Sequence, residues 1–69
     1  MKKYKVNLEK MYFVPFVCYL YAENKDDAFA MYQKELKEHN LMHYGIRKKD
    51  IELVSKKAKK ENTVKFVHL

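Results

Sequence analysis

The stretch FVPFVCYLYAENKDDAFAMY, residues 13–32, changes its hydrophobic pattern at its middle. Up to Ala22 almost every residue is apolar, which predicts a strand over about 13–22 with apolar side chains on both of its faces. Asn24 is a favoured helix N-cap, and beyond it the apolar residues recur at helical spacing. The stretch therefore predicts a strand that leads directly into a helix.

The helix is expected over residues 25–39. Asp26 and Asp27 fall in its first turn, where the helix dipole favours negative charge. Asn40 can adopt the left-handed conformation that ends a helix, which would fold Leu41 back on Leu36. The apolar stripe of this helix consists of Ala28, Phe29, Tyr32 and Leu36.

Three further strands are expected around this unit. Tyr4, Val6 and Leu8 alternate with polar residues and predict a first strand, joined to the second by a hairpin turn near residues 9–12. Residues 50–57 and 63–69 predict two more strands, joined by a hairpin through residues 59–62. Residues 50–60 also fit a helix, because Ile51 and Val54 have helical spacing and lysine favours helices.

The resulting prediction is a single α+β domain over residues 1–69, a small two-layer ββαββ domain with one helix packed on a four-stranded antiparallel sheet. The inward faces of the expected elements are predicted to share one core. Its members are Val6, Leu8, Phe16, Leu20, Phe29, Leu36, Ile51 and Phe66.

Composition limits the class of protein. The 69 residues are 48% hydrophobic and 35% charged, which is typical of one globular domain. A single cysteine cannot form an internal disulfide, and small secreted domains usually need such bonds, so a cytoplasmic protein is expected. Residues 11–22 follow several lysines, as a signal sequence would, but three tyrosines interrupt them and the run is too short to span a membrane.

The amino-acid composition also suggests the kind of genome that encodes the protein. Lysine far outnumbers arginine, while Asn, Tyr and Phe are plentiful and Gly and Pro occur once each. The favoured residues have AT-rich codons, which indicates an AT-rich genome. The expected source is a phage or another mobile element with such a genome.

Positive charge is concentrated in the C-terminal half. Residues 34–69 contain ten basic and five acidic side chains, a net charge of +5, whereas residues 1–33 contain five and four, a net charge of +1. Such lysines could contact phosphates without recognising the base sequence, or could bind an acidic protein. They could also be solvated side chains that protect an edge strand against aggregation. The candidate polyanion-binding residues are Arg47, Lys48, Lys49, Lys56, Lys57, Lys59 and Lys60.

A second candidate surface is aromatic. One face of the expected strand over residues 13–22 is directed away from the helix and presents Phe13, Val17, Tyr19 and Tyr21. Tyrosine is enriched in the centre of protein interfaces, so these four residues predict a protein interface, with a foreign partner or within a homodimer. Stacking of single-stranded bases on the same aromatic side chains is the alternative.

Catalytic and metal-binding patterns are weak. Glu35, His39 and His43 are spaced by four residues, but Asn40 is expected to end the helix before His43, so no metal site is predicted. Cys18 lies mid-strand on the inward face and is interpreted as a buried structural residue. With no glycine-rich phosphate loop and a single serine, we expect no enzyme, no cofactor and no small-molecule substrate.

The leading functional hypothesis is a non-catalytic binding protein of the inhibitor or modulator type. It would dock on a protein partner through the open sheet face or a sheet edge. No association with a membrane is expected. One alternative is a sequence-nonspecific nucleic-acid-binding protein that uses the C-terminal lysines. The other is a structural subunit that associates only with itself.

Overall fold

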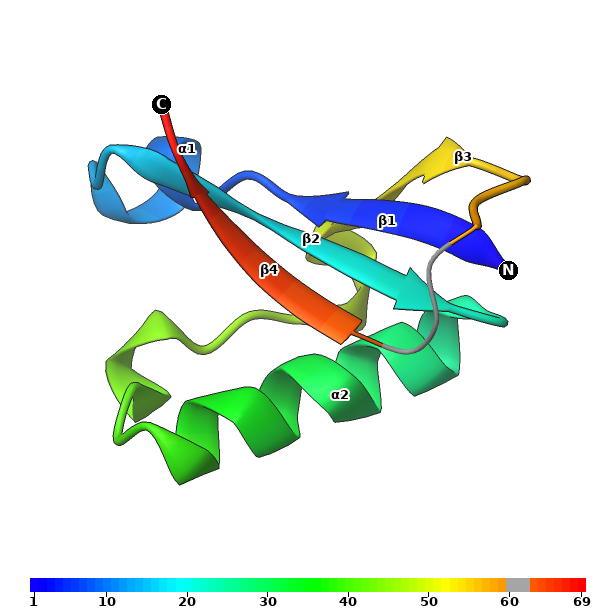
Figure 1. Ribbon diagram of the computed structural model, residues 1–69. Helices are drawn as coiled ribbons and strands as arrows, with labels where there is room; N and C mark the ends of the chain where they lie inside the picture. Colours follow the sequence, from blue (N-terminus) through cyan, green and yellow to red (C-terminus); the bar gives the residue numbers. More distant parts are fainter. Residues whose placement is uncertain (60–62) are drawn as a thin grey trace.

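The computed structural model, which describes residues 1–59 and 63–69, is a small α+β domain with a four-stranded antiparallel sheet and one main helix (Figure 1). The strand order across the sheet is β3-β1-β2-β4. The elements along the chain are β1 (Lys2–Val6), α1 (Leu8–Tyr12), β2 (Phe16–Ala22), α2 (Lys25–Glu38), the 3₁₀ turns η1 (Met42–Tyr44) and η2 (Lys48–Asp50), β3 (Ile51–Ser55) and β4 (Thr63–His68).

The predicted ββαββ order is not matched, because the short helix α1 stands where a hairpin turn was expected. Leu8 is fully buried as the first residue of α1 rather than the last of a strand. Phe13 ends α1 with a φ of 55°, and β2 begins only at Phe16. Pro15 has no backbone N–H to donate to a sheet, which fits a start of β2 after this residue.

The predicted hairpin between the last two strands is wrong. β3 pairs with β1 and β4 pairs with β2, so the two strands lie at opposite edges of the sheet. Pairing with β1 places Ile51 opposite Val6, and both side chains are buried in the core. This gain of buried apolar area explains why β3 joins β1. Residues 60–62 of the expected turn lie outside the described residues.

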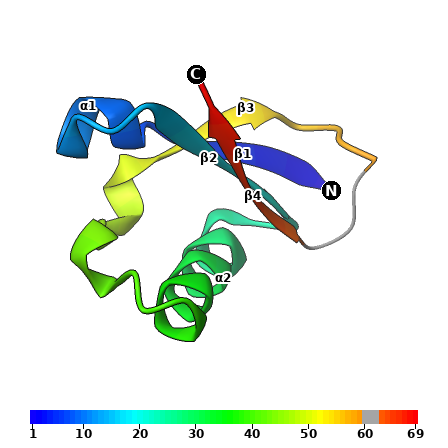
Figure 2. The same cartoon turned by 60° about the vertical axis from the view of Figure 1, so that its left-hand side comes forward.

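The helix prediction is confirmed. α2 ends at Glu38, one residue before the expected end, and the Asn24 side chain accepts a hydrogen bond from the Asp27 N–H at 2.8 Å. Asn40 has a φ of 56°, and the Leu41 N–H donates to the Leu36 carbonyl at 2.8 Å. This is the left-handed helix end that the sequence predicted. α2 covers one face of the sheet and leaves the other face without a helix of similar length (Figure 2).

The core lies between α2 and the sheet. Five of the predicted core residues are buried there, namely Val6, Leu8, Leu20, Leu36 and Ile51. Phe16, Phe29 and Phe66 are only partly buried and pack against its rim. Tyr32 is the largest fully buried side chain of the described residues, and residues 51–55 form a strand, as preferred over the helical alternative.

A candidate binding edge and a basic sheet face

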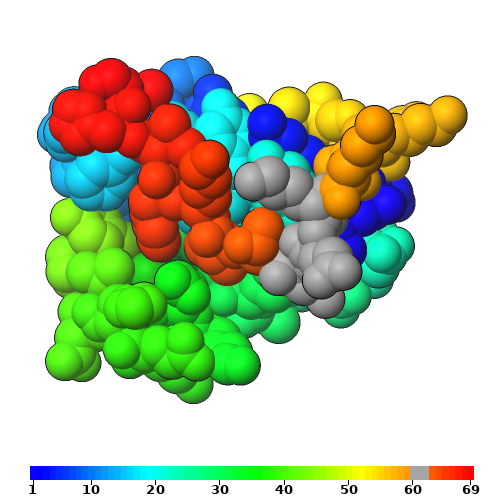
Figure 3. Space-filling model, viewed as in Figure 1, coloured from blue at the N-terminus to red at the C-terminus, as the bar shows by residue number. Residues whose placement is uncertain are grey.

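An apolar hollow lies beside the β4 edge, on the side of the sheet that faces α2. Its volume is about 320 Å³. β4 is an outer strand, and in Figure 3 its orange and red residues lie at the surface above the green residues of α2. The hollow is therefore reached from solvent along a sheet edge. Its lining consists of Phe16, Leu41, Tyr44, Phe66 and His68.

Aromatic side chains give this hollow a fixed shape. Edge-to-face contacts join Tyr12 to Tyr44 at 5.3 Å between ring centroids, Tyr44 to Phe16 at 6.2 Å, and Phe16 to Phe66 at 6.5 Å. This is a favoured geometry for aromatic pairs. The row of rings runs from α1 to the outer strand, so three segments distant in the sequence form one wall.

Two tyrosine hydroxyls hold the segment that carries η1 against the rest of the domain. The Tyr32 hydroxyl donates to the Tyr44 carbonyl at 2.7 Å, and the Tyr12 hydroxyl donates to the Gly45 carbonyl. Burial raises the pKa of Tyr32, which keeps its hydroxyl protonated and able to donate. Neither role was predicted from the sequence, because Tyr32 was assigned to the apolar stripe of the helix and Tyr12 to a hairpin turn.

The four residues of the predicted protein interface do not form one exposed patch. Phe13 is 93% exposed but belongs to the end of α1, whereas Val17 and Tyr21 are buried. Tyr19 is half-buried in the middle of β2. The Lys3 ammonium lies over the Tyr19 ring at 4.3 Å from its centroid and 5.6 Å from that of Tyr21. An interface through this set stays a prediction.

The predicted lysine cluster is divided by β3. Arg47, Lys48 and Lys49 precede this strand, and a second lysine group follows it, so the length of β3 separates them. Lys48 forms an ion pair with Asp26 at the start of α2. Lys56, Lys57 and Lys59 are exposed, and Lys60 lies outside the described residues.

A different group of lysines meets on the sheet face opposite α2. Lys5 of β1 and Lys65 of β4 stand on either side of Tyr19 in the register of the sheet, and Lys3 lies over the Tyr19 ring. These three residues were not among those predicted from the sequence to bind a polyanion. The sequence does place Lys3 and Lys5 on the outward face of β1, because they alternate with the buried Tyr4 and Val6.

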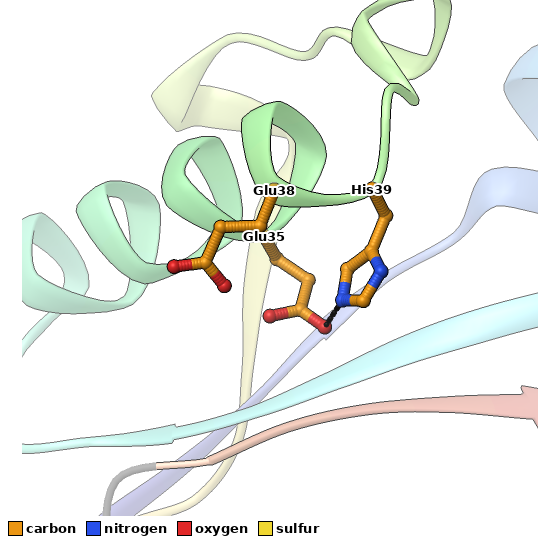
Figure 4. A group of neighbouring side chains, drawn as sticks. All are labelled: Glu35, Glu38 and His39. Atoms are coloured by element: carbon orange, nitrogen blue, oxygen red, sulfur yellow. Dashed lines mark ion pairs between the residues drawn. The ribbon is translucent and has the colours of Figure 1, made fainter.

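Glu35, Glu38 and His39 form a small polar cluster at the end of α2 (Figure 4). One ligand atom of each lies within 4.8 Å of the others. The Glu35 carboxylate oxygen Oε1 lies 3.2 Å from His39 Nε2, and the Glu38 carboxylate oxygen Oε1 lies 3.9 Å from Lys34 Nζ. Both are the pairs expected of residues four apart on a helix surface. His43, the third member of the pattern seen in the sequence, lies in η1 outside this cluster.

Cys18 is buried on the inward face of β2, as expected. Burial, with a smaller contribution from the Glu35 charge, raises the pKa of its thiol to about 12. The reactive form of cysteine is the thiolate, so this side chain stays protonated near neutral pH and packs as a small apolar group.

Comparison of the chain with models of protein families, with curated proteins and with solved structures gives no match. Within residues 1–59 and 63–69, no helix has the length and apolar character needed to cross a membrane.

Proposed function

We propose that this chain is a non-catalytic binding protein that captures an extended segment of a protein partner along the β4 edge. The observation that carries the proposal is the outer strand β4 beside an apolar hollow of about 320 Å³. Strand addition at a sheet edge is a recurring mode of peptide recognition, in which main-chain hydrogen bonds give affinity and side-chain pockets give specificity.

The backbone of β4 favours this mode. The Leu69 N–H donates to the Pro15 carbonyl at 2.8 Å, which directs the backbone of residue 69 toward β2. Because this direction alternates along an antiparallel strand, Val64, Phe66 and His68 direct their N–H and C=O groups outward. Each of the three residues thus offers one donor and one acceptor to an incoming strand.

The side chains fit the same geometry. Residues directly opposite each other in antiparallel strands project to the same face of the sheet. A partner residue paired with Phe66 would therefore project toward the α2 side, where the hollow lies. The volume is at the lower end of the range for ligand pockets, which suits a large apolar side chain rather than a separate small-molecule ligand. The expected partner segment is extended and carries an aromatic or aliphatic anchor.

Selection from a random-peptide display library would test the proposal, with affinities then measured by fluorescence anisotropy. His68→Pro removes one outward N–H and leaves the bonds to β2 in place, and edge strands tolerate proline. We expect selected peptides to lose about tenfold in affinity for this variant, equivalent to about 1.4 kcal/mol. The matched control His68→Ala keeps the N–H and should lose less than about threefold.

Amide hydrogen exchange locates the bound peptide. In the proposed complex the amides of Val64, Phe66 and His68 become protected, while those already bonded to β2 change little. Equal losses for the two His68 variants, or protection confined to another surface, would contradict the proposal.

A second copy of the chain is the alternative occupant of the same edge. Sedimentation over a range of concentrations distinguishes this case, because pairing of two β4 edges gives a dimer that His68→Pro dissociates. That result would replace the foreign partner with the self-associating subunit.

A further inference from the structure

The two layers of this domain carry charge of opposite sign. The four strands contain four lysines and one glutamate, a net charge of +3, whereas α2 contains three lysines and four carboxylates, a net charge of −1. Lys56, Lys57 and Lys59 add three exposed charges next to the start of β1, where the Ala58 N–H donates to the Met1 carbonyl at 2.7 Å. The sheet is therefore the basic side of the described residues.

Three of the strand lysines surround one aromatic ring. In the register of the sheet, Lys5 and Lys65 are the direct neighbours of Tyr19, and the Lys3 ammonium lies 4.3 Å from the centroid of its ring. Within the described residues, no carboxylate lies within 4.0 Å of these three ammonium groups. Glu52, opposite Lys5, is the acidic residue of the strands. The face thus offers three cations without ion-pair partners among the described residues.

From this arrangement we infer that the sheet face opposite α2 binds single-stranded nucleic acid, with Lys3, Lys5 and Lys65 contacting phosphates and Tyr19 stacking on a base. Positive grooves with aromatic side chains are the usual means of binding single strands without sequence preference. The cation–π contact between Lys3 and Tyr19 is weak at an exposed site, so a base can replace the ammonium group on the ring and leave it free to meet a phosphate. Lys65 belongs to β4, but this surface lies on the sheet face opposite the one that borders the hollow.

The single strand is favoured over a duplex because of Tyr19. A half-buried ring in the middle of a strand offers its surface to an unpaired base, whereas the bases of a duplex are stacked on one another. A lysine-rich surface with no arginine among the three contacts supplies phosphate binding and little base discrimination. Weak binding that is indifferent to sequence is therefore expected at physiological salt, in about the micromolar range.

The test measures binding of a fluorescein-labelled oligothymidylate by anisotropy over a series of salt concentrations. The triple variant Lys3→Gln, Lys5→Gln, Lys65→Gln should lower the slope of log affinity against log salt by about 2, close to 0.7 for each lost contact on a single strand. The matched control Lys25→Gln, Lys34→Gln, Lys37→Gln removes the same charge from α2 and should change the slope by less than half as much.

Two further variants separate the contributions. Tyr19→Leu should weaken binding by about fivefold or more and leave the salt slope unchanged, because it removes the aromatic surface and no charge. Lys56→Gln, Lys57→Gln, Lys59→Gln tests the lysine group after β3. The circular dichroism of every variant is compared with that of the original chain to show that the fold is kept.

The inference is supported if the oligothymidylate binds more tightly than a duplex of the same length and the sheet-face variant has the largest effect on slope. It is overturned by equal effects of the sheet-face and α2 variants, which would indicate net charge alone. A larger effect of the group after β3, binding of the duplex at least as tight, or no measurable binding would also overturn it.

Discussion

The two edges of the sheet are built differently, although each belongs to a short strand beside a central one. At β3 the register with β1 shifts between Lys3 and Tyr4, which leaves Val54 as the extra residue of a bulge. At β4 the register with β2 is unbroken from Phe16 opposite His68 to Tyr21 opposite Thr63. One edge is thus interrupted by a bulge, and the other is regular in its pairing.

The neighbours of the two edges differ as well. β3 has exposed charge at Glu52 and exposed lysines after its end, and a bulge with charged residues is a common way to prevent pairing with another chain. β4 carries Val64 and Phe66, which are partly buried at the rim of the core, beside the hollow that Tyr44 helps to line. This difference is the reason why β4, rather than β3, is proposed to accept a partner strand.

Leu36→Ala is expected to have the largest effect, because Leu36 is fully buried beneath the sheet and both edges depend on the same core. Truncating a buried leucine should lower the free energy of unfolding by about 2–5 kcal/mol, which in a domain of this size leaves it largely unfolded. Thermal melting measures the loss. A melting curve that barely changes, or loss of amide protection at one edge only, would show that the edges do not share this core.

Tyr32→Phe should have an intermediate effect confined to the β4 side. The substitution removes the hydroxyl that donates to the Tyr44 carbonyl and keeps the buried ring, so we expect a loss of about 1 kcal/mol in unfolding free energy. The wall of the hollow should loosen with it, and peptides selected on the original chain should bind more weakly. Unchanged peptide affinity would show that the position of η1 does not matter for binding.

Val54→Lys should have the smallest effect. Val54 is 48% exposed in the bulge of β3, and surface substitutions of this kind usually change the unfolding free energy by less than about 0.5 kcal/mol. Urea denaturation and peptide affinity should both match those of the original chain. A clear loss of peptide binding in this variant would assign recognition to β3 and reverse the comparison.

The sequence predicted α2 well because its signals are local. Asn24 and Asn40 each act on residues only a few positions away, and each appears in the structure with the expected geometry. The strand character of β1, β2, β3 and β4 also followed from short-range patterns. The hairpin turn between the first two strands did not, because the alternation of Tyr4, Val6 and Leu8 does not show whether Leu8 ends a strand or begins a helix, and the structure places it as the buried first residue of α1.

The candidate site was only partly predictable. Phe16 and Phe66 were assigned to the inward side from their alternation, and both lie at the rim of the core, where they line the hollow. Leu41 was expected to fold back on Leu36, but no pattern in the sequence marked Leu41 or Tyr44 as part of a hollow at the β4 edge. The basic sheet face was not predicted, because Lys65 is far from Lys3 and Lys5 in the sequence. It lies on the same face only because β2 pairs with both β1 and β4.

The sequence by itself therefore determined the helix and its ends, the faces of the strands, the class of the fold and the excess of positive charge. Only the tertiary structure decided that β3 and β4 lie at opposite edges, because strand neighbours are chosen by which pairing buries the most apolar area, and no local pattern contains that choice. The same choice left β4 as an outer strand above η1 and so produced the hollow at its edge.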